Sequence, residues 1–282
     1  RDSVASRGLG DVYKRQASLC ADLGAEADDL DRIVGAIDPA AWDAPTPAPR
    51  WTVRDQIAHL WCFDHRALLS LTDPAAFADD ARWLAANGGA EASVALGRAM
   101  SPGELLDVWR QGRAHLLTAA ADLDPSARVP WYGPSMSARS CLTARLMETW
   151  AHGQDVADAL GAIRVPTDRL RHVAHIGVRA RPFSYAVRRL EMPAGDVHVA
   201  LRSPSGGAWM WDDPSNGDGT GAAADSVTGS ALDFCLVVTQ RRHLADTDLV
   251  VRGPLAEEWM SIAQAFAGPP GEGRAPGQFT GR

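Results

Sequence analysis

The sequence predicts an α+β protein, in which an antiparallel bundle of four long helices precedes a small α+β domain. Two observations support this prediction. Apolar residues recur every three or four positions through most of the first 190 residues, which is the period of an amphipathic helix. After Pro193 the period changes to two, which is typical of strands. Short connections between the predicted helices favour antiparallel neighbours.

Residues 1–16 differ from the rest of the chain because they hold its only lysine, Lys14, while every later basic side chain except histidine is arginine. They resemble translated adapter sequence, so we interpret them as a non-native leader and leave them out of the fold. The predicted parts are then a helical bundle at 17–190, a small α+β domain at 194–268 and a flexible, glycine-rich tail at 269–282.

The first two helices of the bundle have clear sequence signals. Apolar residues at helical spacing predict a helix over 17–37, and a proline-rich connection follows it. Thr52 with Asp55 three residues later forms a capping-box pattern, which predicts a second helix from there to about Leu71. Trp51, just before the cap, is placed to pack on this helix start.

The rest of the bundle is predicted in the same way. A helix over 75–100 is expected to break at its Gly-Gly pair, and Ser101 with Glu104 predicts a helix that reaches about residue 123. The aromatic and proline-rich stretch 125–137 is predicted to be a loop. The following helix is expected to end at Gly161, because glycine is a natural C-terminal cap.

The last part of the predicted bundle is a further helix over 167–190, and shorter elements follow it. Alternating apolar residues indicate a strand near 197–202, and a second strand is expected at 208–212. A helix over 230–242, a strand over 248–252 and a closing helix over 254–266 complete a small α+β domain.

Composition narrows the range of functions. The chain is 46% hydrophobic and 22% charged, as expected of a globular protein, and its formal net charge is -7. Without a basic block after the leader, nucleic-acid binding is not expected. The four cysteines are scattered and show no CxxC spacing, so we expect neither a disulfide framework nor a thiolate zinc site. No stretch is long and apolar enough to suggest a membrane span, and we expect a cytoplasmic protein.

Glu148 and His152 are the most informative pair, because a spacing of four places both side chains on one face of a helix. His59 lies in an otherwise apolar stretch of an earlier helix. Two imidazoles and one carboxylate are ligands that zinc accepts, and they leave a fourth tetrahedral position open. From spacing alone, a buried histidine that hydrogen-bonds a carboxylate without any metal is the more common arrangement, because a Glu-x-x-x-His pair occurs by chance on many helices.

The two runs around these residues resemble a known family. Residues 51–60, WTVRDQIAHL, and residues 148–156, ETWAHGQDV, are similar to motifs of the mycothiol-dependent maleylpyruvate isomerase family, whose bundle is DinB-like. Matching the motifs residue by residue implies that His59, Glu148 and His152 are the metal ligands. The resemblance covers about 17–161, and more loosely 196–268 resembles the sterol-carrier-like C-terminal domains of such enzymes.

The resemblance also implies an activity. In the family, a divalent metal, for which zinc is our first choice, lowers the pKa of a small thiol, mycothiol, and yields a thiolate nucleophile. In the isomerase the thiolate adds to an activated double bond, permits rotation and leaves, whereas related bundles transfer the thiol to electrophiles. The expected partners are therefore a small-molecule thiol and a small electrophile.

Other residues near these motifs have two interpretations each. Asp55 and Asp155 lie within four residues of a ligand histidine and could hold its imidazole, although helix capping is the simpler role of Asp55. Trp131 and Tyr132 either line a substrate pocket or pack their own loop. Cys62 shares a face with the first histidine, but a buried cysteine most often acts as a small hydrophobe, so we leave it out of the ligand set.

Two other functions fit the same residues. A metal-bound hydroxide at the open position would make the protein a hydrolase of amides or esters. Alternatively, the protein is a non-catalytic metal-binding or apolar-ligand-binding protein, in which the C-terminal module holds the ligand behind Trp209 and Trp211. Dependence on a thiol separates the leading interpretation from both.

Overall fold

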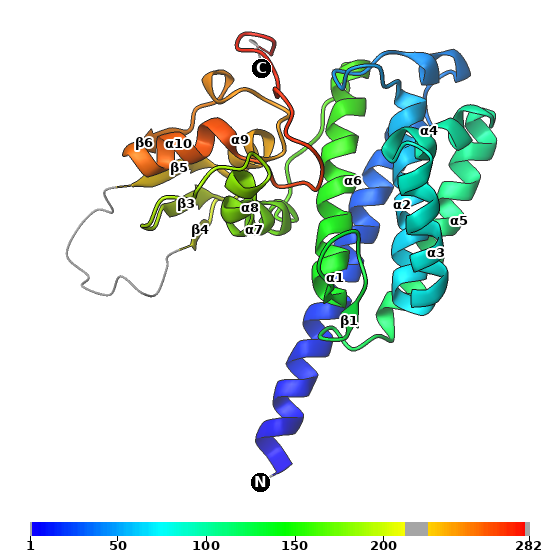
Figure 1. The fold of residues 1–282 in the computed structure, drawn as a ribbon, viewed down its shortest axis with the longest axis horizontal. Coiled ribbons are helices and arrows are strands. Elements are labelled where there is room, and N and C mark those ends of the chain that lie inside the picture. Colours follow the sequence, from blue (N-terminus) through cyan, green and yellow to red (C-terminus); the bar gives the residue numbers. More distant parts are fainter. Residues whose placement is uncertain (1, 212–224, 280–282) are drawn as a thin grey trace. The chain divides into compact units, whose positions relative to one another are not determined.

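The computed structural model describes residues 2–211 and 225–279, with side chains from residue 16 onward. The chain divides into two compact units, Arg1–Arg164 and Val165–Arg282. The first unit is helical and the second combines a sheet with short helices (Figure 1). This confirms the predicted α+β class with an N-terminal helical bundle and a small C-terminal α+β unit.

Four long helices build the bundle of the first unit. Helix α6 packs on both α1 and α2, and α5 packs on the same two helices from the other side. Two shorter helices, α3 and α4, pack on α2. The bounds are α1 Asp2–Val34, α2 Val53–Thr72, α3 Pro74–Ala86, α4 Ala90–Arg98, α5 Pro102–Ala121 and α6 Ala138–Leu160, with a 3-10 helix η1 at Pro39–Asp43.

The predicted helix boundaries of α2, α5 and α6 are confirmed. Thr52 and Asp55 form a complete capping box at the start of α2, and Ser101 and Glu104 form one at the start of α5. Each box satisfies two backbone N–H groups that the first helical turn leaves without partners. Gly161 ends α6 in the left-handed conformation, with φ 63°.

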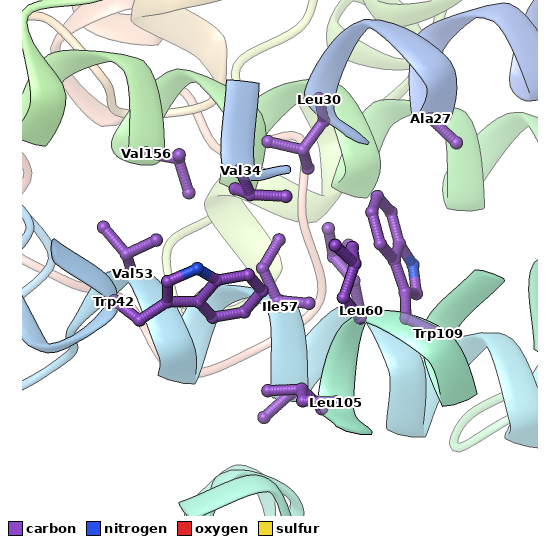
Figure 2. Packing of buried hydrophobic residues seen from close by; sticks show 12 residues of the cluster. Ala27, Leu30, Val34, Trp42, Val53, Ile57, Leu60, Leu105, Trp109 and Val156 are labelled. Carbon is purple, nitrogen blue, oxygen red and sulfur yellow. The ribbon is translucent and has the colours of Figure 1, made fainter. Parts of the chain in front are cut away.

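The bundle is held together by a continuous apolar cluster. Figure 2 shows the labelled side chains of α1 pointing toward those of α2, with two tryptophans filling the space beside them. Burial of this apolar surface is the main stabilising contribution to the bundle. The cluster consists of Ala27, Leu30, Val34, Trp42, Val53, Ile57, Ala58, Leu60, Leu105, Leu106, Trp109 and Val156.

Helix α4 approaches α2 very closely at Gly97. A Cβ added at Gly97 would lie 2.2 Å from Cβ of Ala58 and 3.2 Å from its Cα. Because Cα cannot move without the backbone, we expect Gly97→Ala to lower the free energy of unfolding by about 1–3 kcal/mol. Chemical denaturation measures this change.

Gly103, on α5, offers a matched control, because a Cβ added there has nothing within 4 Å. Gly103→Ala is expected to leave stability unchanged or raise it by up to about 1 kcal/mol. Equal stability of the two variants would contradict the close contact between α2 and α4.

The second unit is built on a four-stranded sheet with strand order β4-β3-β5-β6. Strand β3 runs antiparallel to β4 and parallel to β5, and β5 runs antiparallel to β6. Helix α7 packs on α9, and α8 packs on α10. The bounds are α7 Leu170–Arg179, α8 Arg181–Ala186, β3 His198–Arg202, β4 Ala208–Trp211, β5 Ser226–Ser230, α9 Ala231–Val238, a 3-10 helix η2 Leu244–Asp246, β6 Val250–Arg252 and α10 Pro254–Ile262.

The structure differs from the sequence-based expectations in the middle of the chain. The units divide at 164/165 rather than near 193, because α7 packs on α9 of the second unit. The helix expected over 167–190 is two helices, α7 and α8, since Pro182 near the start of α8 lacks the N–H that a continuous helix needs. The sequence analysis also missed β5, and it interpreted as a loop the stretch that contains a short hairpin of β1 Arg128–Val129 and β2 Met136–Ser137.

Both ends of the chain include segments that the sequence analysis set apart. Helix α1 begins at Asp2, so it runs through most of the stretch interpreted as a leader. Near the other end, the backbone N–H of Gly277 donates to the carboxylate of Asp246 at 2.7 Å. The non-native origin of the leader and the flexibility of the tail remain predictions. In the part of the chain that the structure describes, no helix combines the length and apolar character that a membrane span needs.

Candidate metal centre

Helices α2 and α6 bring His59, Glu148 and His152 together, as the spacing predicts. The two helices run antiparallel, so moving forward along α2 means moving backward along α6. Three pairs of side chains face each other along these helices, which lie in the same bundle in Figure 1. In order along α2, the pairs are Gln56 with His152, His59 with Glu148, and Asp64 with Arg145.

The three candidate ligands face one another through suitable atoms. One ligand atom from each side chain lies within 4.8 Å of the other two. Oε2 of Glu148 is 3.1 Å from Nε2 of His152 and 3.8 Å from Nε2 of His59. Ligand atoms bound to zinc at about 2.0–2.2 Å stand roughly 3.5 Å apart in a tetrahedron. Small side-chain movements therefore suffice for these three atoms to bind one ion.

The electrostatics of the cluster suit a cation. Burial, with help from nearby His152, lowers the pKa of His59 to about 4, so this imidazole is neutral at neutral pH. Burial alone would raise the pKa of Glu148, but its interactions with His152 and His59 hold that pKa well below its usual value. A neutral imidazole and an ionised carboxylate are the forms that bind a metal.

Burial shields the cluster but leaves it partly accessible. The side chains of His59, His152 and Glu148 keep 11%, 10% and 21% of their surface exposed. Within the described residues, Nδ1 of His59 is buried without a hydrogen-bond partner. The three donor side chains are therefore mostly shielded from solvent and still partly accessible to it.

Gln56 is a site residue that the sequence analysis missed. Its Oε1 lies 2.5 Å from Nδ1 of His152, on the side of the ring away from Glu148. The residue lies within the WTVRDQIAHL run, three positions before His59, so its face of α2 could have been recognised from helical spacing.

The two aspartates proposed as partners of the histidines have different surroundings. Asp55 accepts hydrogen bonds from the backbone N–H of Thr52 at 3.0 Å and from Arg98 at 2.7 Å. The capping role of Asp55 is thus confirmed. Asp155 is fully buried on α6. A role of either residue in holding a ligand histidine remains a prediction.

Aromatic rings surround the histidines. The ring centroid of Trp51 lies 5.1 Å from that of His59. The Trp51 ring also stacks on the ring of His152, with centroids 5.8 Å apart. The ring centroid of Phe63 lies 4.4 Å from that of His59. These rings replace water around the imidazoles and restrict their rotation.

Trp131 and Tyr132 lie in the connection between β1 and β2. Tyr132 is 5.8 Å from Phe63, which itself contacts His59, so a line of rings joins the hairpin to the ligands. Trp131 stacks on Phe77 of α3 at 5.6 Å. Tyr132 is 41% exposed, and burial of the rest of its side chain raises its pKa to about 12. The hydroxyl therefore keeps its proton at neutral pH.

Cys62 lies on α2 close to His59 in sequence but has a different environment. Its Sγ is 3.2 Å from the carbonyl oxygen of Ser93, and burial raises its pKa to about 11. A thiol that keeps its proton is a poor nucleophile and a poor metal ligand. This environment agrees with the interpretation of Cys62 as a small buried hydrophobe.

Comparison with known proteins identifies relatives that cover most of the chain. Residues 23–157 match the family model described as "Mycothiol maleylpyruvate isomerase N-terminal domain". Two proteins of Mycobacterium tuberculosis, from strains CDC 1551 / Oshkosh and H37Rv, are each 49% identical over 256 residues, which span 90% of this chain and 97% of theirs. Both relatives are described as uncharacterized proteins.

Solved structures show the same fold at lower identity. The crystal structure of a mycothiol-dependent maleylpyruvate isomerase is 19% identical and covers 82% of this chain and 90% of its own, with a TM-score of 0.52. A histidine-to-alanine mutant of a mycothiol-dependent maleylpyruvate isomerase is 18% identical with the same coverage and a TM-score of 0.53. The shared fold, the matching N-terminal domain and the motifs around the candidate metal centre together show that this chain belongs to the mycothiol-dependent maleylpyruvate isomerase family.

Proposed function

We propose that this protein is a metal-dependent enzyme that activates a small thiol, mycothiol or a close analogue, for addition to a small electrophile. The observation that carries the proposal is the convergence of three ligand atoms from α2 and α6 at a partly accessible point. Family membership supports the thiol, because the matching domain and the solved relatives are named for mycothiol.

The donor set favours zinc as the resident ion, since two imidazoles and a carboxylate leave one tetrahedral position open. The ion would lower the pKa of a thiol that binds beside it, so that the thiolate forms at neutral pH. The ligand side chains supply one negative charge from Glu148 and two neutral nitrogens. With a divalent ion bound, that combination would leave the centre with a net positive charge, which favours a thiolate.

The chain's own residues would position the substrates around this point. The rings of Trp51 and Phe63 flank His59 and exclude water from one side of it. Trp131 and Tyr132 on the hairpin are proposed to line the electrophile's pocket, with the protonated Tyr132 hydroxyl as a hydrogen-bond donor. Donation to a carbonyl of the electrophile would stabilise charge that develops during thiolate addition.

Two reaction outcomes are compatible with this site. In an isomerisation, the thiolate adds to one carbon of a double bond, the resulting single bond rotates, and the thiolate leaves, so the thiol is regenerated. In a transfer, the carbon–sulfur bond remains and one thiol is consumed per electrophile. The solved relatives are isomerases by name, which favours isomerisation of a maleylpyruvate-like substrate.

The proposal is tested by purifying the protein without added metal, loading it with zinc and measuring turnover with and without mycothiol. Maleylpyruvate-like, epoxide and quinone electrophiles cover the main substrate classes. We expect turnover only when both zinc and thiol are present, with thiol concentration constant for an isomerase and falling for a transferase. Thiol-independent hydrolysis of an ester or amide, or no zinc bound by the wild-type protein, would overturn it.

A further inference from the structure

A line of hydrogen bonds leads from the backbone to one of the candidate metal ligands. The hydroxyl of Thr46 lies 2.8 Å from the carbonyl oxygen of Trp51. The side-chain amide nitrogen of Gln56 lies 2.9 Å from that hydroxyl, and its oxygen lies 2.5 Å from Nδ1 of His152. Gln56 is fully buried, so water does not compete for its amide.

The direction of this line follows from its first member. Two oxygens 2.8 Å apart need a proton between them, and a carbonyl has none, so the hydroxyl of Thr46 donates to Trp51. The oxygen of Thr46 can then only accept from Gln56, whose amide nitrogen must face it. The amide oxygen consequently faces His152 and accepts, which places a proton on Nδ1 of that ring.

The opposite direction is unfavourable on two counts. An amide turned by 180° would draw the Thr46 proton toward Gln56 and leave two oxygens in contact without a proton between them. It would also require an unprotonated Nδ1 on His152, which places the proton of the neutral ring on Nε2. A protonated Nε2 cannot bind a metal.

We propose that Thr46 and Gln56 are positioning residues, which hold His152 in the tautomer that presents the lone pair of Nε2 to the metal. The inference rests on the proposed metal centre and adds to it the residues that prepare one of its ligands. Nδ1 of His59, by contrast, is buried without a hydrogen-bond partner among the described residues. The fold therefore orients one of the two histidines. It does so through a chain of hydrogen bonds that begins at the backbone carbonyl of Trp51.

The proposal predicts that Thr46→Val weakens zinc binding although Thr46 does not touch the ion. Valine keeps the shape of threonine but removes the hydroxyl, so the amide of Gln56 is free to turn. Loss of such a supporting group typically lowers metal affinity about 10- to 100-fold. The dissociation constant is measured on metal-free full-length protein by competition with a chromophoric zinc chelator.

Two variants control for a purely structural effect. Thr46→Ser retains the hydroxyl and is expected to bind zinc within about threefold of wild type, since the hydrogen bonds are kept. Thr239→Val is a control in the second unit, because Thr239, like Thr46, donates its hydroxyl to a backbone carbonyl, here that of Cys235 at 2.7 Å. It is expected to bind zinc like wild type.

A second readout covers the case in which Thr46→Val folds poorly. In the zinc-loaded protein with ¹⁵N-labelled histidine, the Nδ1–H of His152 is expected to give a signal protected from exchange with water. Gln56→Met, which removes the acceptor, should abolish that protection and weaken zinc binding by a similar factor.

The outcomes separate the two proposals. If wild-type protein binds no zinc, the proposed function fails. If wild type binds zinc and both Thr46→Val and Gln56→Met bind it equally well, the metal centre stands and the positioning role is wrong. Equal loss in Thr46→Val and Thr46→Ser would also overturn it, because the hydroxyl would then not be the relevant group.

Discussion

His152→Ala is expected to weaken zinc binding on the order of 100-fold, and combining it with His59→Ala is expected to leave little ion bound. A structural zinc site with four protein ligands binds with about 10–16 kcal/mol, so one ligand contributes on the order of 3 kcal/mol. That contribution corresponds to roughly a factor of 100 in affinity. Chelator competition gives the affinity, and elemental analysis gives the zinc content of the double variant.

His65→Ala is the matched control, because His65 lies on the same helix as His59 but is exposed. It should bind zinc like wild type. Zinc at 100 times its dissociation constant should also raise the free energy of unfolding of wild type by about 2.7 kcal/mol. The double variant should show no such rise, and a zinc content equal to that of wild type would contradict the assignment of these ligands.

Arg145→Met is expected to lower the free energy of unfolding by about 3–5 kcal/mol, the usual cost of leaving a buried charge without its partner. Arg145 and Asp64 are both almost fully buried, and Nε of Arg145 donates to Asp64 at 3.0 Å. Without Arg145, the carboxylate of Asp64 still accepts a hydrogen bond from the indole N–H of Trp109, at 3.2 Å. Urea or guanidinium denaturation measures the loss.

The loss should depend on pH in a defined direction. Burial raises the pKa of Asp64, although Arg145 opposes that rise. A carboxyl group with a folded-state pKa above its unfolded value favours folding at low pH and loses that contribution as pH rises through the folded pKa. Removing Arg145 raises the pKa further, so the deficit of Arg145→Met relative to wild type should shrink as pH is lowered from about 8 to about 5.

A double variant distinguishes a broken ion pair from lost packing. Replacing both partners, as Asp64→Leu with Arg145→Met, should recover most of the stability, because a buried ion pair can often be exchanged for apolar side chains at little cost. A double variant as unstable as Arg145→Met alone would show that the pair is not the source of the effect. The pair joins α2 to α6 about one turn from the proposed metal ligands, so it also supports the register of the two helices.

The bundle and the face of α6 that carries two of the candidate ligands were predictable because their signals are local. Capping boxes at Thr52 and Ser101 and the left-handed Gly161 are short-range patterns, and the structure contains all three. The four-residue spacing of Glu148 and His152 fixes their common face. Their convergence with His59 required only that two apolar helices pack side by side.

Long-range contacts escaped the sequence analysis. Gln56 supports His152, 96 residues later, and a buried glutamine gives no local sign of its partner. The sequence indicated Trp51 as a residue near the start of α2 but gave no sign that its ring lies against both histidines. Strand β5 is five residues long and pairs in parallel with β3. Parallel strands are not joined by a tight turn, so no turn motif in the sequence predicts this pairing.

The position of the division between the two units depends on how the helices pack and not on where the hydrophobic period of the sequence changes. The helical pattern continues past Arg164, so the sequence favoured a bundle that extends to 190. Gly177 on α7 would place a Cβ 2.7 Å from Val238 on α9, which shows how closely α7 fits the second unit. Such complementarity depends on residues 61 positions apart in the chain, beyond any local pattern.

The most direct test of the metal centre is an anomalous difference map collected at the zinc absorption edge from crystals of the zinc-loaded wild-type protein. The proposed site predicts one strong peak about 2.0–2.2 Å from Nε2 of His59, Nε2 of His152 and a carboxylate oxygen of Glu148. A strong peak coordinated by other side chains, with these three left without an ion, would contradict it.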